Sequence, residues 1–144
     1  MSVPGLSRFV EAQDASGTYA AALAELRRGR KTSHWMWFVF PQISGLGRSD
    51  MAQRYAVGSL EEARAYLADP VLGQRLRECC SVLLELHGSE PVAVFGGVDA
   101  VKLQSSMTLF GRAAELDPDR GLFTGILDKY FDGHEDPATL ELLG

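Results

Sequence analysis

The chain has 144 residues, of which 46% are hydrophobic and 23% are charged. A chain of this length and composition is typical of one globular domain, which we expect to span residues 1–144, and it is unlike a wholly disordered protein. Fourteen basic residues against nineteen acidic residues give a net charge of −5. This balance disfavours nucleic acid as a partner, because DNA and RNA are usually bound by a basic surface.

The two cysteines and the longest apolar run indicate a reduced, cytoplasmic protein without membrane association. Cys79 and Cys80 are adjacent, and neighbouring side chains on a helix point about 100° apart, which suits neither a disulfide nor a metal motif. We expect two reduced core thiols. The apolar run at 35–41 is too short to cross a bilayer, and the N-terminus shows no signal-peptide pattern.

In the first half of the chain, short segments with helical patterning alternate with turn residues. We expect helices over residues 6–13, 18–28, 33–40, 49–56 and 59–68. Side chains that can cap a helix N-terminus stand at or near the start of four of them: Ser7, Thr18, Ser49 and Ser59. The aromatic segment 33–40 lacks the alternation of a strand, and Pro41 ends it, because the residue before a proline avoids the helical region.

The second half continues in the same way. We expect helices from Pro70 to about Gly88, from Pro91 to Gly96, from Asp99 to about Leu116, over residues 122–131, and from Asp136 to about Leu143. Leu103, Met107, Phe110 and Ala114 recur at the spacing of a buried helix face. No hairpin signal and no alternation of strand and helix is present, so the sequence predicts an all-α fold, a compact single-domain bundle of about seven to nine mostly short helices.

The glycine-rich segment 45–50 invites comparison with a dinucleotide-binding loop. The fingerprint requires a third glycine where Asp50 stands, and a strand before the loop. A tight turn is the simpler interpretation. The alternative is that the glycines, Arg48 and the following helix hold a phosphate or another anion, although Asp50 would repel it.

The sequence also does not match the metal-binding motifs that we compared with it. The acidic segment 117–128 lacks the glycine and the final glutamate of a calcium loop. His34, His87 and His134 lie in separate segments, and no second histidine follows His134 at the spacing of a zinc helix. We therefore expect no metal and no cofactor.

Two groups of residues could carry chemistry. In the first, His34 could transfer protons near neutral pH, while Trp35 and Trp37 could form apolar walls for a flat or cationic ligand. The alternative is that the tryptophans build the core and His34 bonds the backbone.

The second group lies on the predicted helix from Asp99. Lys102 reaches Ser105 and Ser106 at helical spacing, and Ser105 reaches Thr108. A lysine whose pKa is lowered by burial could activate a serine. The alternative is that the hydroxyls serve helix packing or line a polar pocket.

These segments also carry a resemblance to a known family. The blocks in question are RFVEAQ (8–13), SHWMWFVFPQ (33–42), GLGRS (45–49), DAVKLQSSMTLF (99–110) and LDKYF (127–131). In this order they resemble a widespread bacterial domain-of-unknown-function family that includes a mycobacterial hypothetical protein and is often labelled calpastatin. The resemblance implies a small, all-helical, cytosolic protein and no particular activity. The calpastatin label fits poorly, since that inhibitor is a disordered repeat protein. Asp69 departs from the histidine expected before Pro70.

The sequence therefore predicts a binding domain, with catalysis as the alternative. The predicted cleft lies between the segment 33–42 and the helix 99–116 of a monomer, and it would hold a small ligand or a protein partner. Its proposed ligand-binding residues are Trp35, Trp37, Gln42, Arg48, Ser105 and Thr108, with Ser106 and Lys102 as further contacts. In the alternative, an enzyme acts on a nucleotide-like or phosphorylated metabolite through His34 as general acid and base, with Lys102 and Ser106 as the other catalytic residues and Arg48 on the phosphate.

Overall fold

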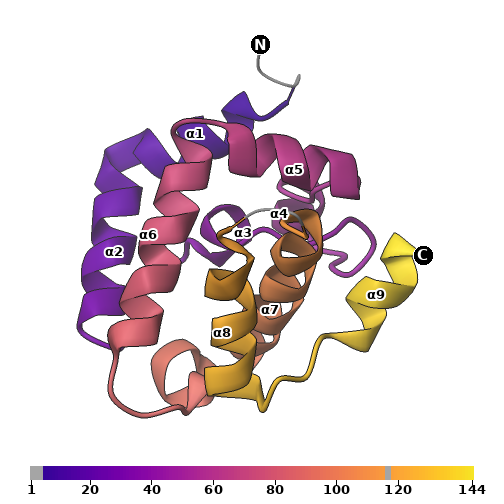
Figure 1. Ribbon diagram of the computed structural model, residues 1–144. Coiled ribbons are helices and arrows are strands. Elements are labelled where there is room, and N and C mark those ends of the chain that lie inside the picture. Colours follow the sequence, from indigo (N-terminus) through magenta and orange to yellow (C-terminus); the bar gives the residue numbers. More distant parts are fainter. Residues whose placement is uncertain (1–4, 116–117) are drawn as a thin grey trace.

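The computed structural model describes residues 5–115 and 118–144, and the regular elements in this part of the chain are helices (Figure 1). The helices are α1 Ser7–Asp14, the short 3-10 helix η1 Ala15–Gly17, α2 Thr18–Arg27, α3 Met36–Val39, α4 Asp50–Arg54, α5 Leu60–Ala68, α6 Leu72–Glu85, α7 Pro91–Ala113, α8 Arg120–Phe131 and α9 Pro137–Leu143. An isolated parallel bridge joins Ile43 to Val57. The all-α prediction is confirmed.

Short polar residues set the start of several helices. The side-chain oxygens of Ser49, Ser59 and Asp136 each accept a hydrogen bond, 3.1 Å long, from the backbone N–H three residues later. These bonds satisfy donors that a helix N-terminus leaves free, as the sequence predicted for Ser49 and Ser59. The same prediction was wrong for Ser7 and Thr18, which are the first residues of α1 and α2 and do not cap them.

The longest helix, α7, contains the break that the sequence predicted. The sequence predicted a short helix, a break at Gly96 and Gly97, and a second helix capped by Asp99. The break is confirmed, because α7 consists of two helical stretches joined at a kink where Gly96 is not helical, but Asp99 lies inside the second stretch rather than capping it. Gly96, with φ 79° and ψ 167°, bends the helix where the break was expected. Only glycine adopts this conformation without strain. Leu116, the predicted end of the helix, and Asp117, the predicted start of the following loop, lie outside the described residues.

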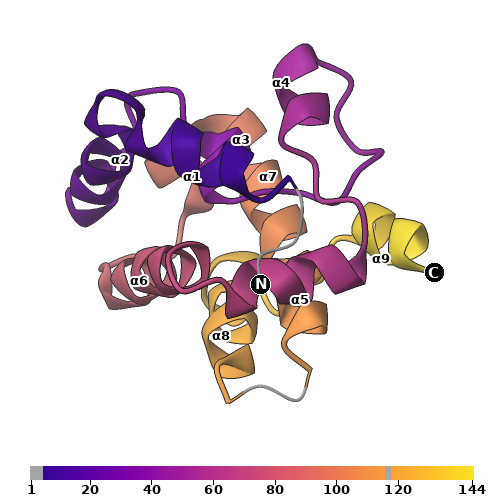
Figure 2. The same ribbon diagram turned by 90° about the horizontal axis from the view of Figure 1, so that it is seen from above.

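The core is built around α7. Seen from above, α5, α8 and α9 lie beside it, and α6 packs against α5 and α8 (Figure 2). Buried aromatic rings connect four helices: Phe9 lies 5.2 Å from Tyr66, Tyr66 lies 5.1 Å from Phe110, and Phe110 lies 6.1 Å from Phe123, measured between ring centroids. Such ring pairs contribute beyond their buried area. The predicted core face of α7 is confirmed, since all four of its side chains are buried.

The cysteines also lie in this core. Cys79 and Cys80 are buried free thiols, and burial raises the pKa of Cys79 to about 12 and that of Cys80 well above its ordinary value. A thiol held protonated in this way is a poor nucleophile. Within the described residues, no helix combines the length and the apolar character needed to cross a membrane.

A buried amide fixes α3 against the rest of the bundle. The Nε2 atom of Gln13, on α1, donates a hydrogen bond to the carbonyl of Phe38 at 2.7 Å, and its Oε1 atom accepts one from Arg75 at 3.1 Å. The side chain of Gln13 is almost completely buried. A buried polar group with its bonds made is specific to one arrangement, so Gln13 sets the position of residues 33–42, the tryptophan-rich segment, relative to α6.

Candidate functional site

The segment before α3 is held by one buried carboxylate. Oε1 of Glu25, on α2, accepts hydrogen bonds from the backbone N–H groups of Thr32 at 2.7 Å and Ser33 at 2.9 Å, and from the indole N–H of Trp35 at 3.0 Å. Burial alone raises the pKa of Glu25, but the hydrogen bonds outweigh burial and lower that pKa to about 2. The carboxylate is ionised at neutral pH and ties the tryptophan-rich segment to α2.

The tryptophan-rich segment and α7 meet through charged side chains. Lys31 Nζ lies 5.0 Å from the centroid of the Trp35 ring, and Lys102 Nζ lies 5.2 Å from that of Trp37. Both amines bind the carboxylate of Asp99, at 2.8 Å and 3.2 Å respectively. Burial alone raises the pKa of Asp99, but its bonds to the two lysines lower it. The two predicted parts of the site are therefore in contact, and Lys102 is already paired.

The three aromatic candidates of the first group differ in exposure. The His34 side chain is exposed, whereas Trp35 is completely buried and Trp37 is partly buried. Trp35 packs at ring-centroid distances of 6.3 Å from Phe40 and 6.5 Å from Phe95. Trp35 thus belongs to the core, and Trp37 is the indole that reaches the surface.

The hydroxyls of α7 hold the C-terminal helix in place. Ser105 Oγ donates a hydrogen bond to the carboxylate of Asp136 at 3.0 Å, and Thr108 Oγ1 accepts one from the backbone N–H of Asp136 at 2.8 Å. Asp136 in turn caps α9. Of the two interpretations of these hydroxyls, this geometry supports helix packing. Ser106 is completely buried, and its Oγ has no hydrogen-bond partner among the described residues.

This arrangement predicts that Asp136→Ala lowers the free energy of unfolding by about 1 to 2 kcal/mol, because α9 loses its cap and Ser105 loses its acceptor. Asp136→Asn, which keeps one oxygen, is expected to cost clearly less. Urea unfolding of both variants measures the difference. Equal losses in the two variants would show that the acceptor oxygen is not what holds α9.

Two predicted ligand-binding residues share a cavity at the other end of the tryptophan-rich segment. It has a volume of about 410 Å³, and its lining residues are Gln42, Ile43, Ser44, Gly45, Gly47, Arg48, Ala52, Gln53 and Ala56. In the described part of the chain, the guanidinium of Arg48 and the side-chain amide of Gln42 have no hydrogen-bond partner. Gln53 donates a hydrogen bond to the Arg48 carbonyl at 2.8 Å, which joins the two sides of the cavity.

The glycines of this loop are required by close packing. A Cβ atom at Gly47 would lie 2.4 Å from the Cβ of Ala52, and one at Gly45 would lie 3.2 Å from the Leu142 side chain. Gly45 also has a φ of 104°, which L side chains rarely adopt. The loop therefore lies directly against α4 on one side and α9 on the other.

The catalytic alternative remains a prediction that these observations do not test. Its three residues are spread over different environments: His34 is exposed, Lys102 is bound to Asp99, and Ser106 is completely buried. A substrate does not reach the Ser106 hydroxyl in this conformation. We therefore build the functional proposal on the cavity.

The protein family described as "protein of unknown function (DUF1810)" matches residues 4–143. The chain belongs to the DUF1810 family. The structure is similar to the crystal structure of the conserved hypothetical protein Rv1873 from Mycobacterium tuberculosis, with a TM-score of 0.90 and 48% sequence identity. The similarity covers 96% of this chain and 95% of that one. No match was found among curated proteins.

These comparisons confirm the family that the sequence blocks predicted, including its mycobacterial hypothetical member. They also confirm the helical fold. Neither description states an activity, a ligand or a partner, so the function rests on the geometry of this chain.

Proposed function

We propose that this protein binds a small anionic ligand, a phosphate ester or a polycarboxylate, in the cavity beside Arg48. The observation that carries the proposal is that Gln42 and Arg48, neither of whose side chains has a partner among the described residues, line one cavity of about 410 Å³. Ligand pockets of small molecules commonly measure about 300 to 1,000 Å³.

The residues that line the cavity offer hydrogen-bond donors for an anion and apolar contacts for the rest of the ligand. A guanidinium offers paired N–H donors that match the two oxygens of a carboxylate or phosphate. The side-chain amide of Gln42 can donate a further bond. Ile43, Ala52 and Ala56 supply apolar wall for the rest of the ligand. Asp50, whose charge opposes an anion, is not among these lining residues.

The predicted cleft at the junction with α7 is a weaker location. There Lys102 is bound to Asp99, and Trp35 is buried. A ligand would have to break an existing ion pair before it could use the lysine. The cavity beside Arg48 requires no such exchange.

Inorganic pyrophosphate and citrate are suitable first probes. We expect either to shift the backbone amide NMR signals of Gly45 and Gly47, and Arg48→Ala to weaken that binding about tenfold or more, the effect of losing about 1.4 kcal/mol of a charge-assisted contact. Arg54→Ala is the matched control, because Arg54 lies on the adjacent α4 but not in the cavity lining.

Two results would contradict the proposal. One is the absence of shifts at the loop glycines with both probes at millimolar concentration. The other is an equal loss of binding in the two arginine variants, which would indicate attraction to the general charge of α4 rather than a site.

A further inference from the structure

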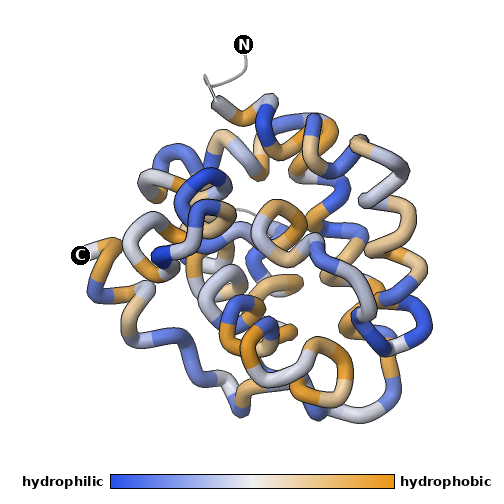
Figure 3. Tube along the Cα trace, turned by 180° about the vertical axis from the view of Figure 1, so that it is seen from behind, coloured by the Kyte–Doolittle hydropathy of each residue, from blue (hydrophilic) through white to orange (hydrophobic). Residues whose placement is uncertain are grey.

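A second surface, at the opposite end of the tryptophan-rich segment, combines unpaired arginines with exposed valines. We define the α2–α7 surface as Arg28 and Arg30 at the end of α2 together with Val92 and Val98 on the first part of α7. Figure 3 shows the strongly hydrophilic end of α2 beside the hydrophobic start of α7. The backbone N–H of Lys31 donates to the carbonyl of Val94 at 2.7 Å, which ties the two segments together.

The apolar half of this surface is unusual for an exposed helix. Val92, Val98 and Val101 are 58%, 73% and 57% exposed, and they are three of the five large hydrophobic residues that stand exposed in the described part of the chain. Single exposed hydrophobic residues need no explanation, whereas an exposed apolar patch marks a site of interaction. Val92 lies before the kink at Gly96, and Val98 and Val101 lie after it.

A cavity opens between the two halves. It has a volume of about 460 Å³ and is lined by Arg28, Gly29, Leu86, His87, Gly88, Glu90, Ala93, Val94 and Tyr130. Leu86, Ala93, Val94 and Tyr130 contribute apolar wall, and Arg28 and Glu90 contribute charges of opposite sign. Lys129 fixes the neighbouring end of α6 by donating to the carbonyls of Leu83 at 2.8 Å and Leu84 at 3.0 Å. The cavity can therefore accept one apolar side chain of a partner.

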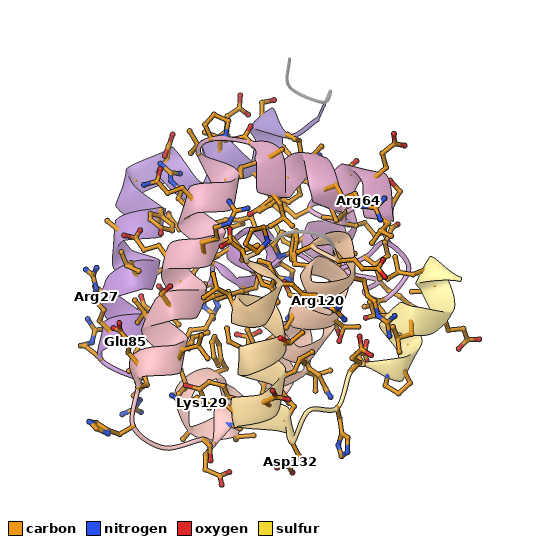
Figure 4. All side chains as sticks on the ribbon, viewed as in Figure 1. Arg27, Arg64, Glu85, Arg120, Lys129 and Asp132 are labelled. Carbon is orange, nitrogen blue, oxygen red and sulfur yellow. The ribbon has the colours of Figure 1, made fainter. Side chains whose placement is uncertain are left out.

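The arginines of this surface indicate that the partner carries negative charge. The chain carries a net charge of −5, yet Arg27, Arg28 and Arg30 stand within four residues of each other. Figure 4 shows Arg27 projecting outward from the end of α2. Within the described residues, the guanidiniums of Arg28 and Arg30 have no ion pair or hydrogen bond. The helix dipole stabilises cations at a helix C-terminus, but this interaction leaves the guanidinium N–H groups that face solvent available to a carboxylate.

We infer that the α2–α7 surface binds an acidic segment of a protein partner, with an aliphatic or aromatic side chain of that segment entering the cavity and its carboxylates pairing with Arg28 and Arg30. A concave cavity beside a basic rim fits a peptide with one apolar anchor better than it fits the flat surface of a bilayer. This site is independent of the cavity beside Arg48.

The probe is a synthetic peptide with two leucines one helical turn apart and glutamate at the other positions, titrated into isotope-labelled protein at low salt. We expect shifts in the methyl signals of Val92 and Val98, and binding that weakens as salt is added. The double variant Arg28→Glu with Arg30→Glu should weaken binding about tenfold or more. Arg64→Glu, at an exposed position on α5, should leave it unchanged.

The apolar half is tested by Val92→Ser with Val98→Ser, which should weaken binding while the melting temperature stays close to that of the parent, since both side chains are exposed. Pyrophosphate binding should be unchanged in both double variants, which separates this inference from the proposed function.

A peptide with lysine in place of glutamate that binds equally well would overturn the inference. Equal binding by the arginine double variant would do the same. Binding to phosphatidylserine vesicles but not to the acidic peptide would assign the surface to membranes instead.

Discussion

Replacing Gly73 with alanine is expected to be among the most destabilising single substitutions in this protein, with a loss of about 3 kcal/mol in the free energy of unfolding. Gly73 is buried in the first turn of α6, where the chain turns from α5. A Cβ atom there would lie 2.1 Å from the carbonyl oxygen of Leu67 and 2.7 Å from the guanidinium of Arg77. The carbonyl is backbone and cannot move aside as a flexible side chain can, so the corner between α5 and α6 has to open.

Gly121→Ala provides the matched control. Gly121 lies in the first turn of α8, and a Cβ atom there meets nothing within 4 Å. Alanine is the better helix former, so this variant should be neutral or more stable by up to about 1 kcal/mol. Urea unfolding measures both. A Gly73→Ala variant as stable as Gly121→Ala would show that the corner adjusts without cost.

Local chemistry made much of the fold predictable from the sequence. Ser49 and Ser59 cap helices as predicted, because a short side-chain oxygen followed by helix-forming residues is sufficient for this role. The same logic misplaced the caps at Ser7 and Thr18, where Leu6 and Gly17 precede the helices without a capping bond. At Gly96 the sequence signal was right about a break between two helical stretches, whereas the cap predicted at Asp99 was wrong, since its carboxylate binds Lys31 and Lys102.

The candidate site was less predictable, because its interactions join distant segments. Lys31 was not among the candidate residues and Asp99 was predicted only to begin a helix, yet they pair with each other between the tryptophan-rich segment and α7. No local pattern marks such a pair. The hydroxyls of Ser105 and Thr108 allowed two interpretations from the sequence, and in the structure both of them form hydrogen bonds with Asp136. For Arg48 the sequence offered a turn or an anion site, and the cavity beside Arg48 is the feature on which we base the proposal of an anion site.

Glu25 went unnoticed in the sequence, and its replacement should have the second large effect. Its side chain is 5% exposed and accepts bonds from Thr32, Ser33 and Trp35. Glu25→Gln leaves one acceptor oxygen in place of two and sets an amide N–H₂ against donors. The pKa of Glu25 falls from its ordinary 4.5 to about 2 on folding. Each unit of pKa shift corresponds to about 1.4 kcal/mol, so the ionised carboxylate stabilises the folded state by about 3 kcal/mol.

The sign of the pH dependence follows from the direction of this shift. The folded state binds the proton less tightly than the unfolded state, so the contribution of Glu25 is complete above about pH 4.5 and is lost as the pH falls towards 2. Glu25→Gln should therefore be less stable than the parent at neutral pH by about 3 kcal/mol, and the difference should shrink as the pH falls.

Urea unfolding at neutral pH and near pH 3 tests this expectation, with the exposed Glu11→Gln as the matched control. If Glu25→Gln does not fold, Ser33→Ala removes a single bond to the same carboxylate and should show a smaller loss with the same pH trend. A constant difference between Glu25→Gln and the parent across this range would mean that the carboxylate gains no stability from being ionised. The hydrogen bonds that hold the tryptophan-rich segment to α2 would then have to be independent of its charge.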